Sequence, residues 1–198
     1  MIYSISGKIA GKSDRFAVVE TAGLGLKIST SQRAIKALPA VGLDTKLFCH
    51  LHVREDALDL YGFITPEELN FFELLISVSG VGPKSALAIL DIDELKNLSA
   101  AIKENRPDLL TRASGIGRKT AERIVLELRG KVGGEHSGLV VQKMESDVDL
   151  VETLSSLGYS KQQAKDVLAR VDEKIIGIED RLKAALKILS RGNRDVDS

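Results

Sequence analysis

The order of hydrophobic and polar residues divides the chain into a strand-rich part followed by two helical parts. Over residues 1–63, short stretches with two-residue alternation are separated by turn residues, which is typical of β-strands. A short helix over 31–38 is expected after the third strand. The five expected strands cover residues 2–7, 16–20, 24–28, 46–53 and 57–63. This order favours a five-stranded OB-type β-barrel, a frequent nucleic-acid platform, although it also fits an unrelated small barrel.

Residues 64–131 show the three- and four-residue spacing of helices and form a central helical domain. Thr65 and Pro66 make a strong helix start, and Glu68 can complete a capping box with Thr65. A further helix is expected over 93–102, and the last helix ends at Gly130.

The remaining residues predict a linker and a second helical domain. Residues 132–146 contain three glycines and no clear period, which indicates a flexible linker. Residues 147–198 predict a three-helix, UBA-like unit, in which Ser160 caps the second helix and 191–198 are a polar tail. Such a small unit has a thin core and often serves as a docking module. The expected fold class is therefore multidomain α+β.

One sequence pattern occurs twice in the central domain, at a constant offset of 35 residues. Residues 74–90 return as 109–125, and each copy contains a Gly-hydrophobic-Gly turn followed by lysine and then serine or threonine. This is the pattern of the helix-hairpin-helix motif. A single short match of this kind is weak, whereas a matched pair at constant offset is specific.

The physical chemistry of this turn predicts phosphate binding. Glycine permits a tight turn and a close approach of the backbone to a ligand, and Val81 or Ile116 can anchor the turn to the core. The helix that follows presents free N–H groups and a positive dipole end, which bind phosphate without reading a base. The predicted phosphate-binding residues are Gly80, Val81, Gly82, Lys84, Ser85, Gly115, Ile116, Gly117, Arg118, Lys119, Thr120 and Arg123.

Two other phosphate motifs are excluded by their spacing. A nucleotide-binding P-loop needs glycine directly before lysine, and Pro83 and Arg118 stand between them here. The dinucleotide fingerprint needs a third glycine where Ser85 and Thr120 stand. The net charge of zero means that any nucleic-acid binding depends on local patches. Residues 105–131 form one, with seven basic residues against three acidic ones.

The sequence predicts neither a cofactor nor a metal site. His50 and His52 share one strand face but have no third ligand nearby, and Cys49 on the opposite face is expected to be buried. A single cysteine suits a reducing compartment. Without a signal peptide or a membrane-length apolar run, a cytoplasmic protein without membrane attachment is expected.

The chain resembles the RuvA family, the junction-binding subunit of bacterial Holliday junction branch migration complexes. The resemblance runs from residue 1 to about residue 189. It depends on the segments 53–57 (Val-Arg-Glu-Asp-Ala), 60–63 (Leu-Tyr-Gly-Phe), 79–84, 114–123 and 157–160 (Leu-Gly-Tyr-Ser).

The resemblance implies a role for Glu55 and Asp56, which on their own would be read as a solvated turn. In this family the corresponding turn is an acidic pin at the centre of an open four-way junction, surrounded by four subunits. Arg54 beside the pin could offset part of its charge. The implied assembly is a homotetramer, with one or two tetramers per junction left open.

The resemblance also implies the function and the partners. The chain would be a non-catalytic subunit that binds four-way junction DNA irrespective of sequence, in recombination, DNA repair and the SOS response. Residues 147–198 would dock on RuvB, a hexameric AAA+ ATPase, and a junction resolvase stays open as a further partner. From the residues alone, a hairpin-containing glycosylase or nuclease and a protein-interaction scaffold are the alternatives. A two-metal nuclease would need more carboxylates than Glu55 and Asp56.

Overall fold

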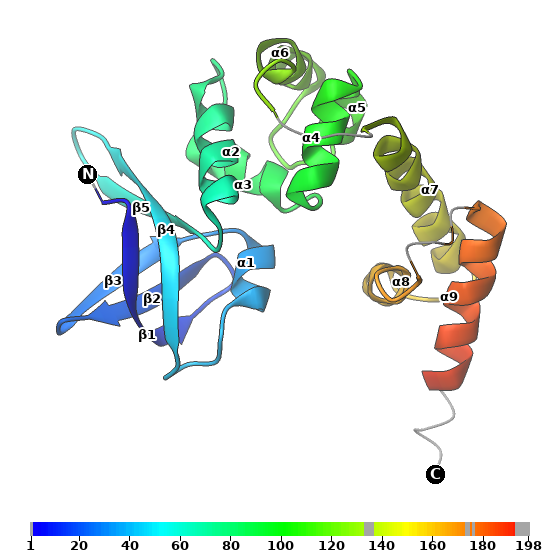
Figure 1. Cartoon of the computed structure of the whole chain (residues 1–198), viewed down its shortest axis with the longest axis horizontal. Coiled ribbons are helices and arrows are strands. Elements are labelled where there is room, and N and C mark those ends of the chain that lie inside the picture. Colours follow the sequence, from blue (N-terminus) through cyan, green and yellow to red (C-terminus); the bar gives the residue numbers. More distant parts are fainter. Residues whose placement is uncertain (1, 133–136, 173–174, 176, 193–198) are drawn as a thin grey trace. The chain divides into compact units, whose positions relative to one another are not determined.

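The computed structural model describes residues 2–132, 137–172, 175 and 177–192 (Figure 1). The chain forms two compact units, Met1–Ser137 and Gly138–Ser198, and each is described by itself. The first unit contains the strands and the first six helices of the numbering used in Figure 1, and the second contains the last three.

The strands of the first unit close into a five-stranded barrel with the order β1-β2-β3-β5-β4. Neighbouring strands are antiparallel except β3 and β5, which run parallel through the pair Ser29 and Tyr61. The expected barrel, with one helix between the third and fourth strands, is confirmed. The elements are β1 (Ser4–Lys12), β2 (Phe16–Thr21), β3 (Leu24–Ser29), α1 (Gln32–Ala37), β4 (Asp44–Val53) and β5 (Leu58–Phe63).

The barrel interior is filled by aliphatic side chains that alternate along each strand. Its buried members are Ile5, Ile9, Ala17, Val19, Ile28, Leu38, Leu47, Cys49 and Leu60. Packing explains why position 62 of the Leu-Tyr-Gly-Phe segment is glycine, because a Cβ atom there would lie 2.4 Å from Cγ2 of Ile28. The carbonyl of Gly62 also accepts a buried hydrogen bond of 2.6 Å from the hydroxyl of Thr30.

Five helices follow the barrel and build a second core. They are α2 (Pro66–Ser77), α3 (Pro83–Leu90), α4 (Leu95–Lys103), α5 (Pro107–Leu110) and α6 (Arg118–Leu128). The hydroxyl of Thr65 caps α2, as expected, by accepting from the N–H of Glu68 at 3.2 Å. The reciprocal bond differs from a capping box, because the carboxylate of Glu68 accepts from the N–H of Ile64 at 3.0 Å.

Aromatic side chains join the barrel to the helices. Tyr61 and Phe63 of β5 belong to the helical core, and their rings lie 5.3 and 4.8 Å from the ring of Phe72 on α2, between centroids. On another edge, Nδ1 of His50 on β4 lies 3.0 Å from Oε1 of Glu73 on α2. The barrel and the helices therefore form one compact body rather than two independently packed parts.

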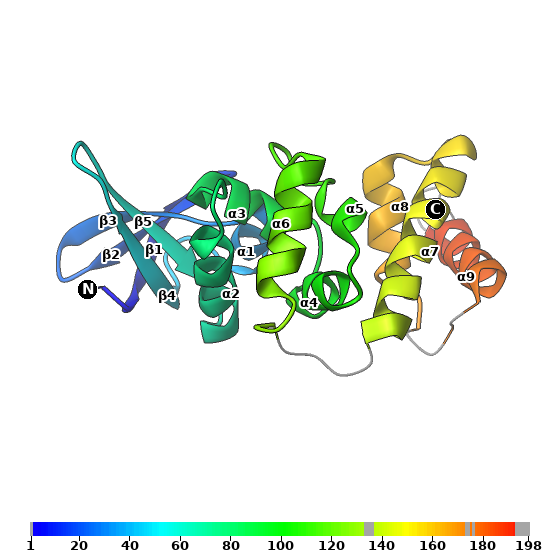
Figure 2. The same cartoon turned by 90° about the horizontal axis from the view of Figure 1, so that it is seen from above.

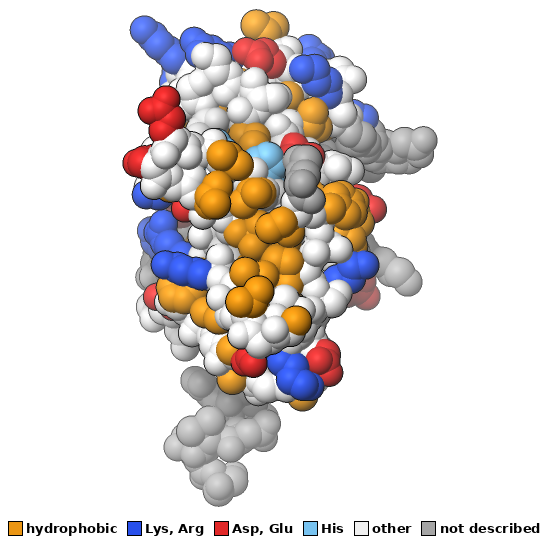
Figure 3. Space-filling model, turned by 90° about the vertical axis from the view of Figure 1, so that its left-hand side faces the viewer, with side chains coloured by type: hydrophobic (Ala, Val, Ile, Leu, Met, Phe, Trp, Pro, Cys, Tyr) orange, Lys and Arg blue, Asp and Glu red, His pale blue; other side chains and the backbone are white. Residues whose placement is uncertain are grey.

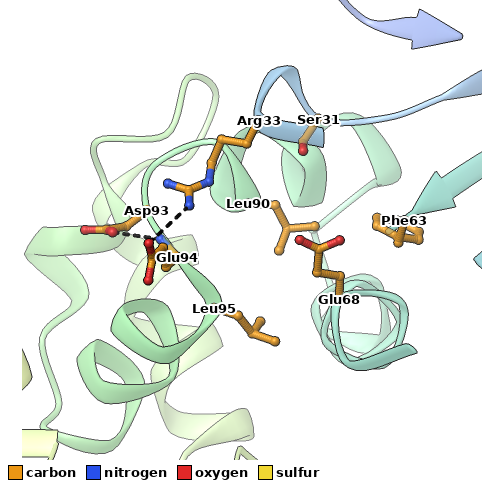
Figure 4. Close-up of a pocket in the computed structure, with 8 residues that line it drawn as sticks. All are labelled: Ser31, Arg33, Phe63, Glu68, Leu90, Asp93, Glu94 and Leu95. Carbon is orange, nitrogen blue, oxygen red and sulfur yellow. Dashed lines mark hydrogen bonds and ion pairs between the residues drawn. The ribbon is translucent and has the colours of Figure 1, made fainter. Parts of the chain in front are cut away.

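A second contact region between the barrel and the helices surrounds a small pocket of about 120 Å³ (Figure 4). The carboxylate of Asp91 accepts from the N–H of Arg33 at 3.3 Å, next to the start of α1. Burial raises the pKa of Asp91, and the backbone N–H groups of α1 offset part of that rise. The guanidinium of Arg33 reaches Glu94 at 4.0 Å. Because Glu68, Asp93 and Glu94 also line the pocket, a phosphate would be repelled there.

The second unit consists of α7 (Ser137–Ser156), α8 (Lys161–Leu168) and α9 (Ile178–Gly192). Its core contains Leu150, Leu154, Ala164, Val167, Leu168, Val171 and Ala185. Ser160 caps α8 in a complete capping box with Gln163, as expected for the cap. The buried guanidinium of Arg181 on α9 forms an ion pair with Asp147 on α7. The expected three-helix arrangement is confirmed.

The prediction of a flexible linker over 132–146 is wrong from Ser137 onwards, where α7 begins. The segment contains three glycines, but it also has the apolar period of a helix, because Val140, Met144, Val148 and Val151 recur every three or four residues. Val132, the first residue of the expected linker, is buried in the core of the first unit. Residues 133–136 and the end of the expected tail, 193–198, lie outside the described residues.

The part of the chain that the structure describes contains no helix that is both long and apolar enough to cross a membrane.

Replacing Gly62 with alanine is expected to destabilise the first unit, because the added Cβ would meet Ile28 inside the closed barrel. Overpacking of this kind costs about 1–3 kcal/mol, measurable as a lower midpoint of chemical unfolding. Gly25→Ala on β3 is the matched control, since its Cβ would meet Val18 at an ordinary 3.5 Å. Equal stability of Gly62→Ala and the unaltered chain would contradict the packing.

Candidate nucleic-acid interface

The first hairpin turns between α2 and α3. Gly80 has φ of +87°, a left-handed conformation that glycine adopts without the steric cost of a side chain. The N–H of Val81 donates to the carbonyl of Val78 at 3.0 Å, and the Val81 side chain is buried. Gly82 then occupies the N-cap of α3. The apolar residue therefore anchors the turn to the core, as the sequence predicted.

The second hairpin repeats this geometry between α5 and α6. Gly115 has φ of +83°, the N–H of Ile116 donates to the carbonyl of Ala113 at 3.1 Å, and Ile116 is buried. Gly117 occupies the N-cap of α6. The copies differ in the helix before the turn, because α5 has four residues where α2 has twelve.

Both helices after the turns begin without a side-chain cap. A Cβ atom built on Gly82 or Gly117 would meet no atom within 4 Å, so the backbone there is open to an approaching ligand. A hollow of about 480 Å³ adjoins the second hairpin and is lined by Pro107, Asp108, Thr111, Ile116, Gly117 and Arg118. First-turn N–H groups without a cap and with open space in front are suited to bind an anion.

Charged side chains stand beside these helix starts. Lys84 and Lys119 are exposed, and neither has an ion-pair partner among the described residues. Arg118 differs, because its Nε donates to Glu122 at 2.9 Å, one helical turn along α6. Ser85 and Thr120 are half-buried in the first turns of α3 and α6. The two lysines are therefore the cations most available to a phosphate.

The two hairpins contact each other. Nη1 of Arg123 on α6 donates to the carbonyl of Ser79 in the first turn at 2.9 Å. In the other direction, a Cβ atom on Gly115 in the second turn would lie 4.0 Å from the hydroxyl of Ser85 on α3. Sequence reasoning grouped Arg123 with the phosphate ligands and missed its bond to Ser79. A signal was present, since the residue 35 positions earlier in the repeat is Ala88 and the arginine breaks the symmetry.

Glu55 and Asp56 lie at the tip of the β4–β5 hairpin, where the N–H of Arg54 donates to the carbonyl of Ala57 at 2.9 Å. Both acids are exposed, and neither carboxylate has a partner within the described part of the chain. Arg54 does not neutralise them, because its Nη2 donates to Asp59 on β5 at 3.0 Å. The tip projects from the barrel away from α3 and α6 (Figures 1 and 2). The structure therefore keeps the acidic tip apart from the hairpins.

The histidines of β4 take part in packing. The rings of His50 and His52 lie 6.3 Å apart between centroids, and that of His50 lies 5.6 Å from the ring of Phe72. Across the described residues, no three histidine, cysteine, aspartate or glutamate side chains gather closely enough to hold a metal ion. Burial raises the pKa of Cys49 to about 11, so its thiol is unreactive at neutral pH.

Exposed hydrophobic side chains gather on the barrel side of the molecule (Figure 3). The large exposed hydrophobic residues of strands and loops in the barrel are Ile2, Tyr3, Leu24, Val41, Leu43, Val53 and Leu58. In the second unit, Leu157 and Ile178 are exposed in the same way.

Three protein families match the chain in succession. The RuvA N-terminal domain matches residues 1–62, and a SAM-like tandem of helix-hairpin-helix motifs matches residues 72–131. The RuvA C-terminal domain matches residues 148–190. The matches follow the barrel, the paired hairpins and the second unit in order.

Relatives of nearly the same length are similar throughout. The chain is 40% identical to a protein of Acetivibrio thermocellus named Holliday junction branch migration complex subunit RuvA, over 96% of this chain and 100% of the relative. Proteins of the same name from Dehalococcoides mccartyi and Caldanaerobacter subterraneus are 38% and 41% identical, and the matches cover 94% and 96% of this chain and 97% and 100% of the relatives. The chain belongs to the RuvA family.

Proposed function

We propose that this chain is the junction-binding subunit of a branch migration complex, a non-catalytic protein that holds a four-way DNA junction open. The observation that carries the proposal is the pair of hairpins, each with an uncapped helix start and a free lysine. Such surfaces bind backbone phosphate and leave the bases unread. Family membership supports the same function in recombination and DNA repair.

The proposed phosphate contacts come from the backbone of both turns and from the side chains beside them. Gly82 and Gly117 let the strand approach the first-turn N–H groups, and Lys84 and Lys119 supply charge. Arg118 contributes less than a free cation, because Glu122 already holds its guanidinium. The proposed contacts are Gly80, Val81, Gly82, Lys84, Ser85, Gly115, Ile116, Gly117, Arg118, Lys119 and Thr120.

We propose that Glu55 and Asp56 act as a pin at the junction centre. Their carboxylates are exposed and unpaired within the described residues, so each subunit would present two uncompensated negative charges there. Repulsion of the crossover phosphates at the centre, with attraction at the hairpins, would keep the strands apart and free to slide. Because Arg54 is bound to Asp59, it orders the base of the turn rather than neutralising its tip.

The proposed assembly is a homotetramer around the junction. The exposed hydrophobic residues of the barrel supply apolar surface that a neighbouring subunit would cover, since large patches of this kind are rare on monomers. A fourfold arrangement would bring four acidic tips to one centre, matching the symmetry of a four-way junction. We also propose that the protein acts in the cytoplasm.

The second unit is proposed to dock on the RuvB-type ATPase that drives migration. It has its own core, separate from that of the first unit, and exposes Leu157 and Ile178. The chain carries no P-loop sequence, so ATP hydrolysis would belong to the partner. A resolvase would be a further partner on the assembled junction.

Junction binding is expected to weaken steeply with salt, with a log–log slope of about −0.9 per phosphate neutralised. Lys119→Ala is expected to weaken binding to all junction sequences alike and to make that slope shallower by about one contact. Gel shifts on four-way and linear DNA of identical arm sequence measure both effects. Lys36→Ala on α1 is the control, because it removes an exposed charge far from the hairpins in sequence. A flat salt response or a strong base preference would contradict phosphate binding.

Removing residues 138–198 is expected to leave junction binding intact and to abolish stimulation of the ATPase. The first unit keeps its whole core in this truncation, since the two units share no core residues. Band shifts and an ATPase assay with the partner provide the two measurements. Loss of junction recognition by a folded truncation would show that the modular interpretation is wrong.

Glu55→Gln combined with Asp56→Asn is expected to tighten junction binding and to weaken discrimination against linear duplex. The change removes two charges per subunit while keeping side-chain size, so repulsion at the crossover is lost. Branch migration with the partner motor should change in rate as well. Asp14→Asn with Glu20→Gln, two exposed acids of the barrel, is the control. Affinity, discrimination and migration rate all equal to those of the unaltered protein would make the tip a simple solvated turn.

A further inference from the structure

The contact between the two hairpins involves one charged side chain. Nη1 of Arg123 lies 2.9 Å from the carbonyl oxygen of Ser79, 44 residues earlier in the chain. A Cβ atom on Gly80 would lie 3.7 Å from the same nitrogen, so the guanidinium rests against the glycine turn itself. Helix α2 ends at Ser77, and the Ser79 carbonyl lies in the turn beyond it. The arginine therefore bonds the turn at the point where it leaves the helix.

This bond connects the two helix starts, of α3 and α6, whose separation matters for binding two phosphates. Arg123 belongs to α6, whose start at Gly117 is one phosphate site, and Ser79 lies three residues before Gly82, the start of the other. A hydrogen bond from a charged donor is about twice as strong as a neutral one. Around it, Val81 and Ile116 are anchored in the same core. The two helix starts are therefore held by a core beneath them and by Arg123 across the surface.

The first copy of the repeat has no arginine that could make the reciprocal bond. The position equivalent to Arg123 in the first copy is Ala88, a partly buried residue that packs against the core. If position 123 served only as a phosphate ligand, the same chemistry would be useful in both copies. A bond that links the copies is needed once.

We propose that Arg123 is a positioning residue that fixes the distance between the two phosphate-binding helix starts. The inference rests on the proposed function, since the spacing matters for two contacts on one DNA backbone. When two sites are held at the right separation, the second contact forms intramolecularly, and this gain is lost when the geometry varies. Arginine suits the role because its planar guanidinium keeps a fixed direction of donation, whereas lysine is a flexible point charge.

The first measurement is the distance between the starts of α3 and α6 in the absence of DNA. Spin labels on Lys84→Cys and Arg118→Cys report the distance between the starts of α3 and α6, and the buried Cys49 does not compete for label. Arg123→Met, which keeps a long stem without donor or charge, is expected to broaden the distance distribution. It is also expected to raise amide hydrogen exchange at Gly80 and Val81 by about tenfold, the factor that 1.4 kcal/mol represents. Arg129→Met at the C-cap of α6 is the control, because Arg129 is exposed and has no partner among the described residues.

Junction affinity of the unlabelled full chain is then measured at a temperature where every variant is folded. Arg123→Met should lose roughly tenfold or more, as expected for loss of a bond to a charged group, whereas Arg129→Met should lose much less. Arg123→Lys, which keeps the charge, should restore affinity only in part. A role confined to stability would lower the melting temperature and leave the affinity of the folded variant unchanged.

That result would overturn the proposal, and so would two others. One is an unchanged label distance and hydrogen exchange in Arg123→Met, and the other is full affinity in Arg123→Lys while its label distance stays broad. The second result would assign Arg123 to direct phosphate binding. If the unaltered chain fails to prefer four-way DNA, the proposed function fails instead, and the DNA-free measurements still decide whether Arg123 fixes the spacing.

Discussion

The packing of β5 against α2 is the interaction on which the geometry of the first unit depends. Leu60 of β5 faces the barrel core, whereas Tyr61 and Phe63 face the helices and surround Phe72. One strand thus contributes to two cores. The acidic tip connects β4 and β5, and α2 leads from the end of β5 into the first hairpin. The packing of β5 against α2 therefore determines where the acids of the tip lie relative to the lysines of the hairpins. The bond between His50 and Glu73 reinforces the same seam.

Several charged side chains of the first unit are paired with an opposite charge. Arg106 hydrogen-bonds to Asp108, which lowers the pKa of that carboxyl, and Arg118 is held by Glu122. In each pair the two opposite charges lie close together, so they create little electric field at a distance. The zero net charge of the chain therefore conceals two local features, the lysines at the helix starts and the acids at the tip. On the proposed function, their separation within the first unit would let the lysines hold the DNA arms while the acids repel the phosphates at the crossing point.

The barrel, the hairpins and the helix caps could be predicted from the sequence because each depends on neighbouring residues. Alternation defines the strands, and the turns require a left-handed residue, which glycine supplies at Gly80 and Gly115. The contacts of Arg54 and Arg123 could not be predicted in the same way. Arg54 is followed by the acids Glu55, Asp56 and Asp59, and only the strand pairing selects Asp59. The partner of Arg123 lies 44 residues away and is a carbonyl, which leaves no mark on residue type. The start of α7 was missed because glycines outweighed a weak apolar period.

The first helices of the two hairpins differ in length because they have different neighbours. Helix α2 must reach from the barrel to the turn and cover β4 and β5 on the way, which requires its twelve residues. Helix α5 has no sheet to cover, and four residues are enough to deliver the chain to Ala113 and the second turn. The first copy thus also links the hairpins to the barrel, whereas the second copy has only a short helix before its turn. A change in the length of α5 would consequently move the second turn and leave the contacts of α2 with β4 and β5 in place.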